Sequence, residues 1–133
     1  MHRLPSHSAL VRFRLSAWFF VLGLVSLIAG LGYLGYAVSI SQERHILIAS
    51  GVIAAGVICL IVQWITSARA RCPLCLTPSM AKKNCSKNRN AQRLLGSYRL
   101  KVASSIILNG HFRCPYCNEP TVLEVRRRPN NGI

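Results

Sequence analysis

Two long stretches without a charged side chain constrain this chain more than any other feature. They occupy residues 15–38 and 46–65. At a helical rise of 1.5 Å per residue they reach about 36 and 30 Å, which is enough to cross a hydrocarbon core of about 30 Å. The rest of the chain is too short to cover two wholly apolar helices in a soluble fold. We therefore expect a transmembrane hairpin of two helices.

A cleaved signal peptide is the alternative for the first stretch. Arg3, Arg12 and Arg14 precede it, and Ala37-Val38-Ser39 loosely resembles a cleavage site. Signal peptides, however, carry an apolar core of only about 7 to 15 residues. The first stretch is longer than this, so a membrane span is favoured.

The charges that flank the hairpin predict its orientation. Three arginines precede the first span and Arg69 and Arg71 follow the second, whereas the connecting segment holds one Arg and one Glu. The positive-inside bias then places both termini, and the module that follows the hairpin, in the cytoplasm. Cytoplasmic thiols are kept reduced, so cysteines there bind metal or do redox work more often than they form lasting disulfides.

The remaining chain divides around the hairpin, and the whole is expected to be an α+β membrane protein. The segments are a basic arm at the headgroups (1–14), the hairpin (15–65), a linker (66–71), a soluble module (72–125) and a basic tail (126–133).

Three strands are expected in the module. Residues 101–108 are rich in β-branched side chains, and Asn109-Gly110 is a strong signal for a tight hairpin turn into a second strand at 111–114. Residues 121–125 favour a third strand. The predicted module is therefore a small antiparallel sheet.

Two cysteine turns of one kind lie in this module. Cys72-Pro73-Leu74-Cys75 recurs as Cys114-Pro115-Tyr116-Cys117. In such a turn the proline fixes φ and both thiolates face one side. Two turns that face each other form a tetrahedral four-sulfur site, the preferred environment of structural Zn²⁺. We expect the metal ligands to be Cys72, Cys75, Cys114 and Cys117.

This pair of turns resembles the zinc-ribbon class, in which two C-P-x-C knuckles lie at the ends of antiparallel strands. The resemblance covers about fifty residues and does not extend to the hairpin. Many zinc-ribbon knuckles carry Gly directly after the second Cys, where this chain has Leu76 and Asn118. Leu does not readily adopt a left-handed backbone, so the first knuckle is expected to be less regular. Arg71 and Arg113 directly precede the turns and could screen the charge of the thiolates.

Other cysteine chemistry stays open at this point. An iron centre of the rubredoxin type, which transfers electrons, uses the same two turns. The second turn resembles the glutaredoxin active site. However, the residues after it have no apolar pattern typical of a helix, and few residues follow. Cys85 and His111 have no partner at knuckle spacing, and Cys59 lies within the second span, so none of the three is expected to bind the metal.

The charge of the chain indicates anionic partners. From residue 66 onward there are thirteen Lys or Arg and two Glu. Basic residues near a cytoplasmic leaflet gain about 1 kcal/mol each from anionic lipid headgroups. A nucleic acid is the alternative partner, although the basic loop at 82–93 has no aromatic side chain within it to stack a base. The candidate contacts are Lys82, Lys83, Lys87, Arg89 and Arg93.

Catalysis is not expected from this sequence. The chain has three carboxylates in total, with no paired acids, no P-loop and no spacing typical of a nucleophilic triad. A closed four-cysteine site leaves no coordination position for a substrate. The expected role is that of a membrane-anchored adaptor that meets an unidentified protein partner.

Overall fold

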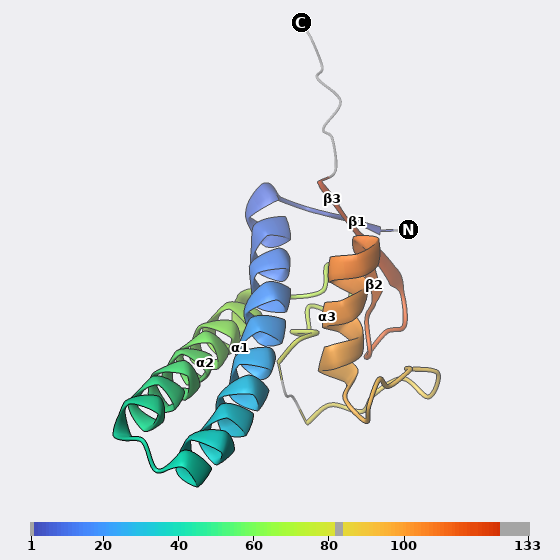
Figure 1. Ribbon diagram of the computed structural model, residues 1–133. Helices are drawn as coiled ribbons and strands as arrows, with labels where there is room; N and C mark the ends of the chain where they lie inside the picture. The colour runs from blue at the N-terminus through green and yellow to red at the C-terminus, as the bar shows by residue number, and fades with distance from the viewer. Residues whose placement is uncertain (1, 82–83, 126–133) are drawn as a thin grey trace, which may run out of the picture.

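The computed structural model describes residues 2–81 and 84–125, and its two longest elements form a helical hairpin (Figure 1). Helix α1 spans His7–Ile40 and helix α2 spans Glu43–Arg69. Ser6 caps the start of α1, because its Oγ accepts a hydrogen bond from the Ala9 N–H. Ser41, in the left-handed conformation, ends it. Both helices are long and apolar enough to cross a membrane.

Small residues line the contact between α1 and α2. Buried positions recur every seven residues, at Gly23, Gly30 and Ala37 on α1 and at Ala49, Gly56 and Gln63 on α2, and all of these except Gln63 are small. A Cβ added at Gly56 would lie 3.3 Å from the Gly23 carbonyl oxygen. Across the same interface the Ser26 hydroxyl donates to the Val52 carbonyl at 3.0 Å. Close backbone approach of this kind is typical of helices that pack in a lipid bilayer, where no hydrophobic driving force brings them together.

Helix α1 extends well beyond the uncharged stretch that predicted it. Its 34 residues amount to about 51 Å, more than a hydrocarbon core of about 30 Å requires. The first turns of α1 begin inside the segment predicted to be a basic arm at the headgroups. Residues His2–Leu4 of that segment form a strand, β1, and Leu4 is fully buried. Contact of the segment with headgroups stays a prediction.

The sheet has three strands in the order β1-β3-β2. Strand β2 (His111–Arg113) pairs antiparallel with β3 (Pro120–Val125), close to the predicted strands at 111–114 and 121–125. Strand β1 pairs parallel with β3, with His2 opposite Thr121. The sheet is therefore mixed rather than antiparallel. The predicted tail at 126–133 lies outside the described residues.

The predicted strand at 101–108 is instead a helix, α3 (Tyr98–Asn109). Its buried residues, Val102, Ala103 and Ile106, fall on one helical face, which packs against the other elements. Ser97 caps its start by accepting from the Leu100 N–H, and Gly110 ends it at φ 64°. The Asn-Gly pair thus marks a helix C-terminus and not a hairpin turn; a glycine at positive φ suits both.

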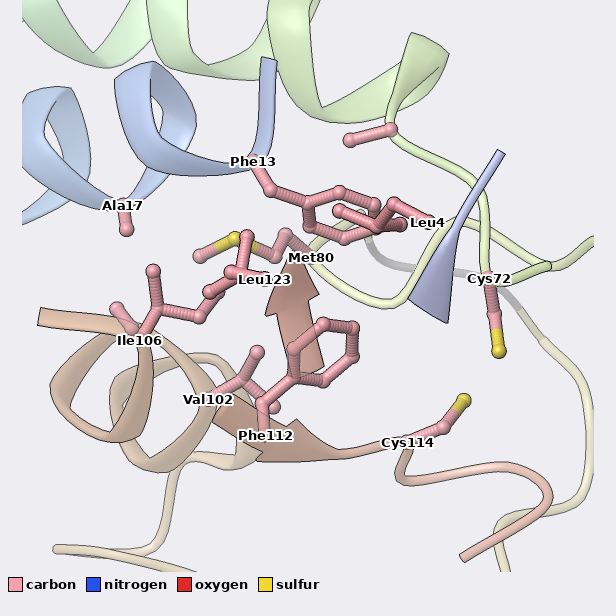
Figure 2. Packing of buried hydrophobic residues seen from close by; sticks show 12 residues of the cluster. Leu4, Phe13, Ala17, Cys72, Met80, Val102, Ile106, Phe112, Cys114 and Leu123 are labelled. Atoms are coloured by element: carbon pink, nitrogen blue, oxygen red, sulfur yellow. The ribbon is translucent and has the colours of Figure 1, made fainter. Parts of the chain in front are cut away.

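One core joins α1 to the module (Figure 2). The rings of Phe13 on α1 and Phe112 on β2 lie 5.1 Å apart between centroids, and both are buried. The other buried apolar members are Leu4, Ala17, Ala70, Met80, Val102, Ala103, Ile106 and Leu123, together with Cys72 and Cys114. Helix α1 packs against α2 and also against α3, so it lies between the second helix and the module (Figure 1).

Candidate metal centre

The first cysteine turn follows α2 almost directly. Helix α2 ends at Arg69, Ala70 is buried, and the backbone of Arg71 pairs with Pro78 on the other side of the turn. Cys72 is therefore fixed against the core instead of being carried on a free linker. The segment predicted as a linker at 66–71 is largely the last turn of α2.

The second cysteine turn follows strand β2. The backbone of Arg113 pairs with Pro120 of β3, so the strand pair brackets this turn as the Arg71–Pro78 bridge brackets the first. The loop before α3 is tied to it as well, because the Asn88 N–H donates to the Pro115 carbonyl at 3.0 Å. No local pattern in the sequence predicts this hydrogen bond.

Both turns close with one hydrogen-bond pattern. The Leu76 N–H donates to the Cys72 carbonyl at 3.0 Å, and the Asn118 N–H donates to the Cys114 carbonyl at 2.8 Å. Leu76 has φ 54° and Asn118 has φ 59°. The expectation that the first knuckle is less regular is therefore wrong. Leu76 adopts the left-handed backbone that the turn requires, at a cost of about 1–2 kcal/mol.

The four sulfur atoms come together in one group. All four Sγ atoms lie within 4.8 Å of one another, with Cys72 and Cys117 4.0 Å apart and Cys75 and Cys114 3.7 Å apart. Four sulfurs bound tetrahedrally at about 2.3 Å from a zinc ion would be separated by about 3.8 Å. Figure 2 shows the sulfurs of Cys72 and Cys114 pointing toward one another. The group could hold a metal ion.

Burial and hydrogen bonds perturb the thiols of this group. The neighbouring Cys114 thiol lowers the pKa of Cys72 to about 5, with further lowering by the backbone N–H groups of Cys75 and Leu74. The hydrogen bond with Cys72 raises the pKa of Cys114, and burial raises it further. Burial also raises the pKa of Cys117. Thiols that bind a metal ion must lose their protons, so metal binding at this group would release protons and depend on pH.

The remaining cysteines lie away from this group. All six are free, Cys59 within α2 and Cys85 exposed in the loop before α3. His111 lies in β2, where its Nδ1 is 3.1 Å from the Asn109 carbonyl oxygen. Within the described residues, the group that could hold a metal contains only the four predicted cysteines.

The predicted basic contacts are only partly described. Lys82 and Lys83 lie outside the described residues. Lys87 and Arg93 lie over the ring of Tyr98, at 4.5 and 4.8 Å from its centroid, and Arg89 is exposed. The loop therefore has an aromatic neighbour, Tyr98 at the start of α3. This contact could not be predicted from the residues of the loop alone. Arg71 and Arg113 are exposed, and screening of the thiolates by them stays a prediction.

Leu76→Asn is expected to stabilise the metal-bound protein by about 1 kcal/mol, because Asn tolerates the left-handed backbone better than Leu. The gain corresponds to about fivefold tighter zinc binding in a competition with a chelator. Leu74→Asn is the matched control, since Leu74 is exposed in the same turn but has no positive φ. Equal gains in the two variants would contradict this account of the strain.

The arrangement of ligands suits a structural role. Two ligands come from a turn fixed to the end of α2 and two from a turn fixed to the end of β2, so a shared ion would cross-link the hairpin to the sheet.

In comparisons with known proteins, no family model matches the chain, and neither a curated protein nor a solved structure matches it.

Proposed function

We propose that this protein is a membrane-anchored adaptor whose soluble module is held together by one structural Zn²⁺ at the cytoplasmic face. The observation that carries the proposal is the convergence of four thiols from two separate turns within 4.8 Å. Four thiolates complete a tetrahedral shell and leave no position for a substrate, which supports a structural and not a catalytic ion.

The junction between hairpin and module supports an anchored platform. Cys72 follows the end of α2 by three positions, and Phe13 of α1 lies in the module core. Both helices of the hairpin are thus fixed to the module, which leaves little freedom for it to move relative to the membrane. A platform of this kind presents one constant face to a protein partner.

The arginines near the module support the cytoplasmic placement. Arg12 and Arg14 lie in the early turns of α1, and Arg69 and Arg71 lie at the end of α2, so all four are at one end of the hairpin. The other end carries Glu43 and Arg44. The positive-inside bias favours the first end as the cytoplasmic one.

The basic loop supports lipid over nucleic acid as the anionic partner. Non-specific binding of single-stranded nucleic acid uses aromatic rings on which bases stack. The ring of Tyr98, the aromatic residue next to this loop, already has Lys87 and Arg93 over it. Competition between RNA and vesicles of anionic lipid for the purified protein distinguishes the two partners, and we expect the vesicles to prevail.

The metal in the purified full-length chain tests the proposal. We expect one zinc per chain and a colourless protein; iron with visible absorption would instead establish an electron-transfer centre. Orientation is tested with a membrane-impermeant maleimide, since Cys85 is exposed and the metal-bound thiolates are protected. Cys85 should be labelled only when the cytoplasmic face is accessible, and labelling from the opposite face alone would overturn the proposed topology.

A further inference from the structure

Helix α3 runs antiparallel to α1, which determines which end of the module faces the hairpin. The C-terminal end of α3 lies near the start of α1, because Gly110 accepts from the Leu123 N–H of β3 and Phe112 stacks on Phe13. Further along α1, Phe20 and Val21 still pack against the core that α3 helps to form. The N-terminal end of α3 is therefore directed toward the membrane-length part of the hairpin (Figure 1).

A tight turn with two exposed leucines lies at this end of α3. Leu94 and Ser97 pair through their backbones, and the turn between them holds Leu95 at φ 49° and Gly96 at φ 78°. Leu95 is 91% exposed and Leu94 is 38% exposed. The turn thus exposes a large apolar side chain at the end of α3 that is directed toward the membrane-length part of the hairpin.

The neighbours of this turn match the chemistry of a membrane interface. Tyr98 follows the turn, and the Lys87 Nζ and the Arg93 guanidinium lie over its ring. The one ion pair among the described residues joins Arg3 and Glu124 and involves neither cation. Leucine in the acyl region, tyrosine at the boundary and unneutralised cations at the headgroups are typical of segments that insert into an anionic leaflet.

We propose that the turn at residues 94–97 inserts Leu95 into the leaflet from which the hairpin emerges. Tyr98 then lies at the boundary, and Lys87 and Arg93 contact lipid phosphates. This inference rests on the proposed membrane hairpin. It adds a third point of contact with the bilayer, so that the module lies on the membrane surface and the face opposite the turn is left for a partner.

The test uses the full chain, loaded with zinc, in vesicles of phosphatidylcholine and phosphatidylglycerol. In a Cys59→Ser, Cys85→Ser background, the variants Leu95→Cys, Leu108→Cys and Leu31→Cys each receive an environment-sensitive fluorophore on the new thiol. Leu108 is the matched control, because it is 79% exposed but lies at the opposite end of α3. Leu31 lies midway along α1 and reports the hairpin itself.

Lipids that carry a nitroxide on the acyl chain should quench the labels at positions 95 and 31 at least threefold more than the label at 108. Quenching at 31 but not at 95 would overturn this inference and leave the membrane hairpin intact. Absence of quenching at 31 would overturn the hairpin, and the inference with it. Protection of position 95 from water without quenching by lipid would also overturn it, since that result indicates contact with another protein surface.

Discussion

Serine at any one of positions 72, 75, 114 and 117 is expected to abolish stoichiometric metal binding and to unfold the soluble module. Each cysteine supplies one of four sulfurs that lie within 4.8 Å, so no other described thiol can take its place. Metal binding contributes about 10–16 kcal/mol in small zinc modules, which is more than a domain of this size gains from its core alone. The measurements are zinc per purified chain and the rate of proteolysis within residues 72–125.

The chain provides two matched controls for these substitutions. Cys59→Ser and Cys85→Ser change cysteines that lie outside the group, one within α2 and one exposed in the loop. Both variants should retain one metal ion per chain and normal resistance to protease. A Cys85→Ser variant without metal, or a Cys117→Ser variant with a full equivalent, would mean that the four-sulfur site is assigned incorrectly.

Phe13→Ala is expected to separate the module from α1 without separating the two helices of the hairpin. Phe13 is fully buried and stacks on Phe112 at 5.1 Å, and removal of a buried phenyl ring costs about 3–5 kcal/mol. Protection of the α3 amides against hydrogen exchange should fall by roughly two to four powers of ten. Exchange within α2 should stay slow, since Phe13 does not lie among the small residues of the hairpin contact.

Trp18→Ala is the control for this substitution. Trp18 is also a large aromatic residue of α1, but it is 52% exposed, on a helix face that the module does not cover. Its removal should change the exchange of α3 amides little. If both variants reduced protection in α3 equally, the loss would reflect a damaged α1 and not a lost contact with the module.

The four-cysteine group and the two apolar helices could be predicted from sequence because their signals are local. A C-P-x-C turn positions its own two sulfurs, and an uncharged stretch of sufficient length determines a helix of membrane dimensions. The sequence could not show the fit between the turns, such as the hydrogen bond from Asn88 to Pro115. Nor could it show that Leu76 would accept a left-handed backbone, since closure of the turn, not residue preference, requires it.

Two elements were decided by contacts distant in sequence. The β-branched residues of 101–108 favoured a strand, yet Val102, Ala103 and Ile106 share one helical face that is buried in the core with α1. Residues 2–4 carry charge and looked like a headgroup arm, yet Leu4 enters the same core and β3 offers a free edge to pair with. Packing outweighs propensity in both cases, because propensities differ by about 1 kcal/mol or less for ordinary residues and burial contributes more.

The sequence by itself therefore determined the membrane-length hairpin and which four cysteines form the cluster. Only the tertiary structure decided that residues 98–109 form a helix, that residues 2–4 form a strand, and that a turn at Leu94–Ser97 precedes α3. The physical reason is the distance in sequence between the residues that interact. Turn geometry and helix length depend on neighbouring residues. The face that an element buries depends on partners about a hundred positions away, such as Thr121, which lies opposite His2.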